Sequence, residues 1–345
     1  MDRSQHRGGP LGWGIVGFGW VARDHAAPAM VAAGHVVRAV CDPMPAARLS
    51  ARNRLDPAGG VHETLTPLLT DPGVEAIYVA TPNHLHRDAV QAIAAAGKPI
   101  LCEKPMAASL DDAEAMAATV GRSRIIYGTA FDQRHHPAHA VMRDALGDGL
   151  IGTPTAIRIV YACWLDAGWS ITGEGDNWRA DPSRAGGGAL MDLAPHGLDL
   201  VEFLLGEPVE EIAALTQRRV QSYAVDDGAL IIGRTVSGVL AQLHVAYNCP
   251  DALPRRRLEV LGGTGQLLAD NTMGQDAGGS ITWINAAGVA RALNFEGAAE
   301  SPFTRQMSAF AHAVRTGDSA GFNIARDLHT MRLLHRAYAG DPSCR

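Results

Sequence analysis

Three side chains in this sequence have the chemistry needed to move a proton and to stabilise a negative oxygen: Lys104, Asp192 and His196. Asp192 and His196 are four residues apart, a spacing that places both side chains on one face of a helix. A histidine that titrates near neutral pH can take or return a hydroxyl proton, and a neighbouring carboxylate can orient its ring. The alternative interpretation of the pair is a capping aspartate and a hydrogen-bonded structural histidine.

Lys104 is unusual for the composition of the chain around it. Of the 30 Lys and Arg residues only Lys98 and Lys104 are lysines, so arginine is used almost wherever a positive charge suffices. An ammonium group is compact, whereas a guanidinium group is planar and always charged. A lysine at this place can therefore donate to a substrate oxygen and stabilise a developing alkoxide, and a surface lysine paired with Glu103 is the alternative.

A glycine-rich turn near the N-terminus is typical of dinucleotide binding. Gly17 and Gly19 occur in the pattern Gly-x-Gly-x-x-Ala, which ends at Ala22 between a predicted strand and a predicted helix. The first glycine permits the tight turn, and the second lets backbone N–H groups approach a pyrophosphate. We expect Trp20 and Val21 to lie against the cofactor in the same loop. A glycine turn beside an incidental aspartate is the alternative interpretation.

The aspartate that follows the second predicted strand bears on the choice of dinucleotide. Asp42 lies twenty residues after Ala22, where a carboxylate can accept hydrogen bonds from the adenosine ribose. A carboxylate there would repel a 2′-phosphate, so NAD is favoured over NADP. Arg48, Arg52 and Arg54 follow closely and could fold back, which leaves NADP open.

Elements that alternate between strand and helix must position these residues. Up to about Asp132, short apolar runs alternate with Ala-rich segments, a pattern that predicts a doubly wound parallel sheet. The predicted strands of this part are 12–18, 36–42, 76–81, 99–102 and 124–131, and the predicted helices are 21–33, 85–96 and one that begins at Ser109. Lys104 then lies at the carboxyl edge of the sheet, where such folds place ligands.

After Asp132 the pattern changes to consecutive strands. A helix over about 137–146, a strand near 155–163 and a helix over 188–205 precede strands at 209–220, 229–236, 239–247, 255–261, 266–270 and 281–285, and helices at 302–316 and 324–339 close the chain. Alternating polar and apolar residues in this region suit an antiparallel sheet with one solvated face. The predicted fold class is α/β, with a Rossmann domain over residues 10–132 and an α+β domain with a largely antiparallel open sheet over 133–340.

Four motifs together resemble the glucose-fructose oxidoreductase and inositol dehydrogenase family, also called Gfo/Idh/MocA. They are Gly17-x-Gly19-x-x-Ala22, Thr81-Pro82-Asn83-x-x-His86, Gly97-Lys98-Pro99-x-x-x-Glu103-Lys104-Pro105 and Gly186-Gly187-Gly188-x-Leu190-x-Asp192-x-x-x-His196-x-x-Asp199. The resemblance covers almost the whole chain. One departure is Ala194-Pro195, where the family more often shows a glycine.

The resemblance implies roles for individual residues. It assigns oxyanion stabilisation to Lys104, proton transfer to His196 and a supporting or substrate-binding role to Asp192, and it implies a substrate-binding and oligomerising second domain. Cofactor contacts are implied for Thr81, Asn83, His86 and Glu103.

Aromatic and basic residues before the glycine run are further substrate-binding candidates. Trp164 and Arg179 suit stacking on, and hydrogen bonding to, a polyhydroxylated ring, although a Trp-rich patch between domains or subunits is an equal alternative. His135, His136 and His139 lack an acidic or thiol partner at ligand spacing, so we expect no metal site.

The expected function is an NAD(P)-dependent dehydrogenase or reductase that interconverts a secondary alcohol and a ketone on a sugar, cyclitol or related polyhydroxy compound. Two alternatives stay open: a redox-neutral sugar-modifying enzyme with tightly bound NAD, and a dinucleotide-sensing regulator without catalysis. The joint presence of Lys104, Asp192 and His196 favours catalysis, since a pure sensor has no chemical need for a proton-transfer pair.

Composition narrows the partners. The chain has a net charge of −6, and its longest basic run is Arg255-Arg256-Arg257, so nucleic acid and anionic membrane are poor partners. Five widely spaced cysteines without a C-x-x-C pair indicate a reducing compartment, and no apolar stretch is long enough to span a membrane. We expect a cytoplasmic protein, and the family resemblance implies a homodimer or homotetramer.

Overall fold

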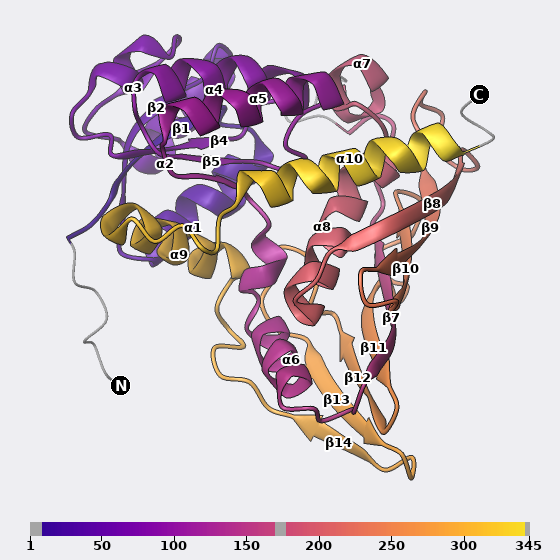
Figure 1. The fold of residues 1–345 in the computed structure, drawn as a ribbon. Helices are drawn as coiled ribbons and strands as arrows, with labels where there is room; N and C mark the ends of the chain where they lie inside the picture. Colours follow the sequence, from indigo (N-terminus) through magenta and orange to yellow (C-terminus); the bar gives the residue numbers. More distant parts are fainter. Residues whose placement is uncertain (1–8, 170–176, 342–345) are drawn as a thin grey trace. The chain divides into compact units, whose positions relative to one another are not determined.

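The structure, a computed structural model, describes residues 9–169 and 177–341 and divides them into two compact units (Figure 1). The first unit contains the described residues of Met1–Ala107, Asp111–Ala130 and Phe303–Leu328. The second unit contains those of Ala108–Leu110, Phe131–Pro302 and His329–Arg345.

The first unit is built on a parallel sheet of six strands in the order β3-β2-β1-β4-β5-β6. These strands are β1 (Gly12–Val16), β2 (Val36–Cys41), β3 (Val61–His62), β4 (Ala76–Val79), β5 (Ile100–Cys102) and β6 (Tyr127–Thr129). The order reverses direction between β1 and β4, the switch point at which open α/β sheets bind dinucleotides. The predicted Rossmann fold is therefore confirmed, with the loops after β1, β2, β4 and β5 at one edge.

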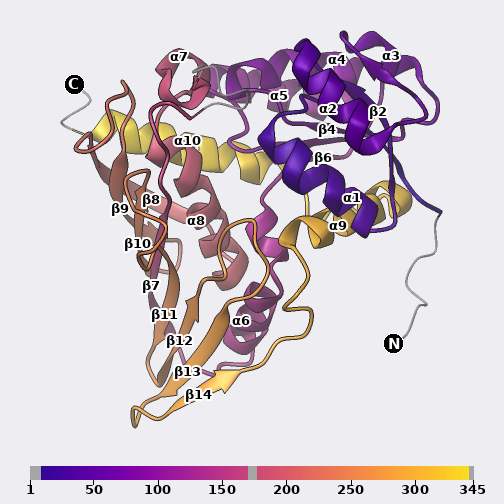
Figure 2. The same cartoon turned by 180° about the vertical axis from the view of Figure 1, so that it is seen from behind.

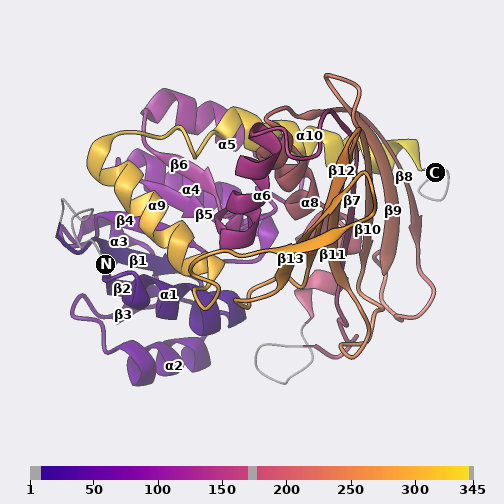
Figure 3. The same ribbon diagram turned by 90° about the horizontal axis from the view of Figure 1, so that it is seen from below.

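Helices cover both faces of this sheet (Figures 1 and 3). The helices of the first unit are η1 (Ala22–Ala26), α1 (Ala27–Ala32), α2 (Pro45–Leu55), α3 (Thr66–Thr70), η2 (Asn83–Leu85), α4 (His86–Ala95), α5 (Leu110–Ser123), α9 (Pro302–Thr316) and the first residues of α10 (Ile324–Gly340). The core on the α1 face contains Trp13 and Tyr78, both fully buried. Burial of such large side chains is the main stabilising contribution to the unit.

The C-terminal segment 303–328 returns to complete the first unit. Phe310 of α9 packs against Trp13 of β1 with ring centroids 5.5 Å apart. Phe322 lies over Gly128 of β6, where a Cβ atom would collide with its ring. The sequence-based division assigned this segment to the second domain, and the structure differs because its aromatic side chains supply part of the first unit's core.

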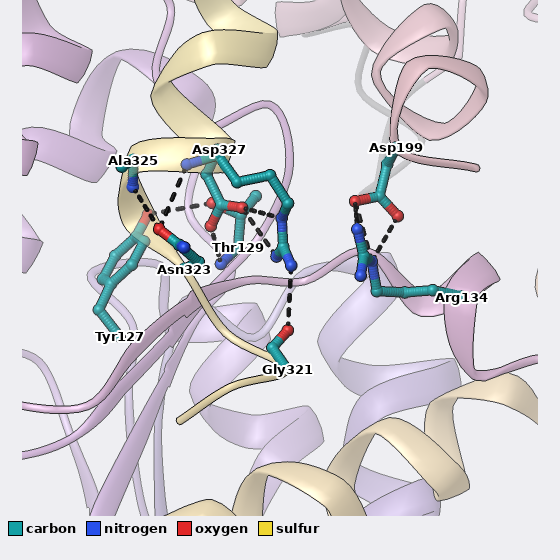
Figure 4. A network of polar contacts seen from close by, with 9 residues as sticks. Tyr127, Thr129, Arg134, Asp199, Gly321, Asn323, Ala325 and Asp327 are labelled. Carbon is teal, nitrogen blue, oxygen red and sulfur yellow. Dashed lines mark hydrogen bonds and ion pairs between the residues drawn. The ribbon is translucent and has the colours of Figure 1, made fainter. Parts of the chain in front are cut away.

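A buried carboxylate fixes the same segment to the sheet (Figure 4). Oδ2 of Asp327 accepts a hydrogen bond from the Thr129 backbone N–H at 2.9 Å, and Oδ1 accepts two from the Arg326 guanidinium at 3.1 and 2.9 Å. The Asp327 side chain is fully buried and that of Arg326 is 9% exposed.

We expect Asp327→Ala to lower the free energy of unfolding by about 3–5 kcal/mol, because it leaves the Arg326 charge buried without this carboxylate. Urea denaturation measures the loss. Arg315→Ala is the control: the Arg315–Glu75 pair also joins α9 to the unit but is about one-third exposed, so its loss should cost less than about 1 kcal/mol. Equal losses in the two variants would contradict the assigned role of Asp327.

The second unit contains an eight-stranded sheet in the order β14-β13-β12-β11-β7-β10-β9-β8. The strands are β7 (Pro154–Ala162), β8 (Val209–Gln217), β9 (Gly228–Thr235), β10 (Leu240–Ala246), β11 (Arg256–Gly262), β12 (Gly265–Asp270), β13 (Ser280–Asn285) and β14 (Ala290–Leu293). All neighbours pair antiparallel except β7 and β10, which are parallel. The predicted, largely antiparallel open sheet is confirmed.

One face of this sheet carries helices α6 (Pro137–Gly147) and α8 (Ala189–Leu205), as Figures 2 and 3 show. Gly197 allows the close approach of α8, because a Cβ atom there would lie 2.5 Å from the Leu243 side chain of β10. The opposite face exposes large apolar side chains on β8, β9 and β10, namely Leu215, Leu230, Ile232 and Leu240. Among the described residues, no helix is both long and apolar enough to cross a membrane.

Candidate active site

The loop after β1 forms a cradle for a phosphate-bearing ligand. Gly17 has a φ of +85°, and a Cβ atom there would lie 2.7 Å from the Ala80 carbonyl oxygen. Only glycine fits this backbone and this close approach. Gly19, Trp20 and Val21 follow and are partly exposed, while η1 begins at Ala22. Because the turn leads into a helix N-terminus beside the switch point of the sheet, its residues fit the pyrophosphate of a dinucleotide.

Asp42 directly follows β2 and orders the loop after β1 through its side chain. Its Oδ2 accepts a hydrogen bond from the Phe18 N–H at 2.7 Å, and its Oδ1 accepts one from the Met44 N–H at 2.8 Å. Arg48 does fold back: its Nη1 donates to the carbonyls of Asp42 and Pro43 at 3.0 and 2.7 Å. Each carboxylate oxygen keeps further acceptor capacity, so Asp42 can still bond a ribose hydroxyl.

We expect NAD(H) to bind at least about tenfold more tightly than NADP(H), because a 2′-phosphate beside Asp42 would meet like charge. Asp42→Ala should narrow this ratio while weakening both cofactors, since the Phe18 N–H loses its acceptor. Fluorescence titration of both cofactors measures the ratio, and Arg48→Ala serves as the control for the neighbouring cation. Tighter binding of NADP(H) to the unaltered protein would show that Asp42 does not select the cofactor.

The loop after β4 carries Thr81, Asn83 and His86. Thr81 is partly exposed, whereas Asn83 is 5% and His86 is 0% exposed. Nε2 of His86 lies 2.9 Å from the Thr81 carbonyl oxygen, and Nδ1 lies 3.2 Å from those of Pro105 and Met106. Burial lowers the pKa of His86. The buried His86 ring therefore ties this loop to the one that follows β5, and the cofactor contact expected of His86 stays a prediction.

Glu103 and Lys104 follow β5 at the same edge. Glu103 is 8% exposed and accepts hydrogen bonds from the Tyr78 hydroxyl and, at 3.2 Å, from the backbone N–H of Lys104. The Lys104–Pro105 peptide bond is cis, and the Lys104 side chain is half-buried. Lys98, the other lysine of the chain, stabilises the backbone before β4. Its Nζ donates to the carbonyls of Asp71 and Val74 at 3.1 and 2.6 Å.

In the second unit, α8 carries both Asp192 and His196. The helix runs through Pro195, so the departure from the family pattern leaves the helical spacing of the pair intact. A carboxylate 38 and 36 positions further along the chain caps the start of the helix: Asp226 accepts hydrogen bonds from the N–H groups of Gly188 and Leu190 at 2.9 and 2.8 Å. Burial raises the pKa of Asp226, and its place at the helix N-terminus favours the charged form.

The side chains of Asp192 and His196 have different neighbours within the second unit. The Tyr247 hydroxyl donates to Oδ2 of Asp192 at 2.7 Å. Nδ1 of His196 lies 3.5 Å from Oδ1 of Asp132, and the Tyr161 ring meets the imidazole edge-on at 5.5 Å. Burial, followed by the charge of Asp192, raises the pKa of Tyr247 well above its ordinary value, so Tyr247 is a hydrogen-bond donor at neutral pH.

The aromatic segment before α8 is held by a stacked cation. The Arg179 guanidinium lies over both Trp169 and Trp178, at 4.6 and 4.5 Å from the ring centroids. Trp164 is 43% exposed and pairs through its backbone with Asn248. Arg179 also lies close enough to Tyr247 for its charge to lower the pKa of that hydroxyl, against the larger effect of burial. The Arg179 charge therefore acts on Tyr247, the residue whose hydroxyl donates to Asp192.

The histidine cluster has a structural explanation. His139 bonds the Gln133 carbonyl at 2.7 Å and the Thr272 hydroxyl at 2.9 Å, and burial lowers its pKa to about 4. Nδ1 of His136 accepts the Ala138 N–H at the start of α6. Within residues 9–169 and 177–341 no three His, Cys, Asp or Glu side chains gather as metal ligands.

The structure thus brings together Gly17, Asp42, Glu103 and Lys104 along one sheet edge of the first unit, and Asp192 and His196 on α8 of the second unit. Sequence reasoning missed Asp132, Asp226 and Tyr247. Asp132 and Asp226 lie beside predicted strands that carry no site residue, and nothing in their spacing connects them with Asp192 or His196.

Comparisons with known proteins agree with this architecture. Residues 11–131 match the oxidoreductase family with an NAD-binding Rossmann fold, and residues 139–268 match the GFO/IDH/MocA C-terminal domain. The chain is 32% identical over 325 residues to 1,5-anhydro-D-fructose reductase of Ensifer adhaerens, which covers 93% of this chain and 95% of that protein. It is 29% identical over 328 residues to inositol 2-dehydrogenase 1 of Saccharopolyspora erythraea, which covers 89% and 87%.

A solved structure of similar fold is the aldose-aldose oxidoreductase from Caulobacter crescentus in complex with glycerol. It superposes with a TM-score of 0.86 at 23% identity and covers 97% of this chain and 98% of that one. Both halves of the sequence and nearly its whole length therefore agree on one assignment. The chain belongs to the Gfo/Idh/MocA family of NAD-binding oxidoreductases.

Proposed function

We propose that the protein interconverts a secondary alcohol and a ketone on a sugar, cyclitol or related polyhydroxy compound by hydride exchange with a nicotinamide cofactor. The observation that carries this proposal is the placement of Asp192 and His196 four residues apart on α8, in a chain whose first unit holds a dinucleotide cradle. A carboxylate and an imidazole so arranged suit the hydroxyl proton of such a substrate.

Each proposed site residue has a role that follows from the chemistry of its side chain. The bound nicotinamide supplies the acceptor or donor of hydride. His196 accepts the hydroxyl proton during oxidation and returns it during reduction. Lys104 donates to the same oxygen and stabilises its negative charge, and Asp192, with one oxygen bonded by Tyr247, accepts from a substrate hydroxyl. Trp164 and Arg179 hold the sugar ring by stacking and hydrogen bonding.

In this proposal Asp42 bonds the adenosine ribose of the dinucleotide. The remaining cofactor contacts come from Gly17, Gly19, Trp20, Val21, Thr81 and Asn83. The Glu103 carboxylate accepts a hydrogen bond from the backbone N–H of Lys104. NAD is the preferred cofactor, because the Asp42 carboxylate that follows β2 would repel a 2′-phosphate on the ribose.

The test is a panel of inositols, hexoses and aminocyclitols, each incubated with NAD and with NADP while absorbance in the reduced-nicotinamide band is followed. A change in absorbance that depends on one class of polyol supports the proposal. Product formation without net reduction of cofactor would instead indicate a redox-neutral enzyme. Tight dinucleotide binding without turnover of any compound would indicate a sensor.

The exposed apolar face over β8, β9 and β10 supports a second element of the proposal, a homodimer or homotetramer, and the widely spaced cysteines support a cytoplasmic location. Such a patch on a sheet is typical of an interface between subunits. Mass measurement in solution tests it, and replacing Ile232, which is 59% exposed, by Asp should shift the mass toward that of one chain.

A further inference from the structure

A short helix of the second unit, which follows β6 in the chain, presents a carboxylate to the ring of His196. This helix, η3 (Asp132–His135), begins with Asp132, whose Oδ1 lies 3.5 Å from Nδ1 of His196. The side chains are 5% and 4% exposed, so little solvent screens the charge. The separation is longer than a hydrogen bond and within the range of an ion pair, and such contacts often tighten when substrate binds.

The orientation of Asp132 is determined by its neighbour in sequence. Nε2 of Gln133 donates to Oδ2 of Asp132 at 2.7 Å and to the Gly274 carbonyl at 2.9 Å. Oε1 of Gln133 accepts the Gly274 N–H at 3.0 Å. Gln133 is thereby anchored to one peptide unit and occupies Oδ2, so Oδ1 is the oxygen directed at the imidazole.

An ion pair one helical turn away fixes η3 against α8. The Arg134 guanidinium donates three hydrogen bonds of 2.7 to 3.0 Å to both oxygens of Asp199 (Figure 4). Asp199 follows His196 by three residues on α8, so both lie on one side of the helix. The Asp199 side chain is 1% exposed and that of Arg134 is 12% exposed. A bidentate pair with this burial restricts movement of Asp132 relative to His196.

We propose that Asp132 is a positioning residue for His196: its carboxylate holds a proton on Nδ1, leaves Nε2 to exchange the substrate proton and balances the positive charge of the ring. This inference rests on the proposed proton-transfer role of His196. During oxidation the substrate O–H bond breaks and an Nε2–H bond forms, while hydride leaves the carbon for the cofactor. Asp132 stays ionised throughout, and Asp192 remains available for a substrate hydroxyl.

The other titratable groups near the His196 ring are neutral or already bonded to another partner, so Asp132 is the carboxylate that acts on Nδ1. Burial and the charge of Asp132 raise the pKa of Tyr161 on β7, so its ring meets His196 as a neutral phenol. Arg256 on β11 acts on Tyr161 in the opposite direction with a smaller effect. Asp192 lies on α8 itself and accepts from Tyr247, and the charge of Asp199 is matched by Arg134.

The test is Asp132→Asn. In this variant the amide oxygen takes the Gln133 hydrogen bond, so the amide NH2 faces Nδ1 and drives the ring proton to Nε2, the wrong tautomer for accepting a proton. We expect kcat for alcohol oxidation to fall about 10- to 100-fold, the scale of lost orienting carboxylates. The acid limb of the rate profile should move to lower pH by about one unit, because the imidazolium loses a stabilising charge. The KM of the substrate and the cofactor affinity should stay near native.

The matched control is Asp341→Asn. Asp341 is also a buried carboxylate of the second unit, 1% exposed, but it bonds the backbone N–H and hydroxyl of Thr216. Its loss should lower stability without moving the acid limb. Asp132→Ala, which removes the side chain without adding a donor, should regain turnover when formate is added.

The outcomes separate the two proposals. If His196→Asn abolishes turnover but Asp132→Asn keeps the native rate and acid limb, Asp132 does not act on His196 and the inference is wrong. Failure of Asp132→Ala to respond to formate, with both Asp132 variants folded, would also overturn it. If His196→Asn itself keeps a high rate and its acid limb, the proposed function of His196 fails first.

Discussion

The His196→Asn variant is expected to lose about 10²- to 10⁴-fold in turnover, the usual contribution of a general acid or base. Asparagine keeps polar atoms at this position but cannot take a proton near neutral pH. In the unaltered enzyme, alcohol oxidation should slow as falling pH protonates the imidazole, and the variant should lack that limb. Steady-state rates between about pH 5 and 9 test both expectations.

Asp192→Asn is the companion variant for His196. Because Asp192 is proposed to bind a substrate hydroxyl, its loss should weaken catalysis about as much as the loss of His196, and a clearly smaller effect would mean that Asp192 only orients the ring. A high rate and an unchanged pH profile in His196→Asn would mean that another group moves the proton. Tyr127 or a bound water would then be the next candidate, and burial, which raises the pKa of the Tyr127 phenol well above its ordinary value, favours the water.

The Lys104→Arg variant is expected to bind cofactor almost normally and to lose about 10²- to 10³-fold in turnover, the effect of removing one oxyanion donor. A guanidinium group is larger than an ammonium group and cannot occupy the same compact position. Cofactor titration and steady-state kinetics on one preparation separate binding from chemistry.

Lys98→Arg is the matched control, because it makes the same exchange at the only other lysine. Nζ of Lys98 bonds two backbone carbonyls that hold the start of β4, and an arginine can still donate there. Turnover of this variant should stay near native. Near-normal turnover of Lys104→Arg would instead return Lys104 to the role of an ordinary surface lysine.

Local patterns were sufficient to predict most of the fold. Apolar runs bounded by glycine and proline correspond to β1, β2, β4 and β5, and the helix predicted over 188–205 is observed as Ala189–Leu205. Several elements had too little pattern to be found, among them α2, β3, α3 and β14. In α2 the one fully buried residue is Ala51, so no apolar face marks the helix, and β14 is a short edge strand with exposed side chains.

The candidate site was predictable only where its residues share a motif. Lys104, Asp192 and His196 lie in contiguous patterns, whereas Asp132 meets His196 across 64 positions through the packing of η3 on α8. The hydrogen bond between Tyr247 and Asp192 likewise depends on the register of β10 against β7 and β9. No local sequence pattern encodes that register. Long-range pairings of this kind are set by tertiary packing.

The return of residues 303–328 to the first unit constrains the order of events during synthesis on the ribosome. Trp13 and the face around it emerge early, but Phe310 and Phe322, which cover part of that face, emerge only after all the strands of the second unit. The nascent chain therefore carries an incomplete hydrophobic surface until the segment 303–328 has been synthesised, and such surfaces attract chaperones. A fragment that ends near residue 132 keeps this defect permanently, so an isolated dinucleotide-binding domain requires the 303–328 segment to be joined to it.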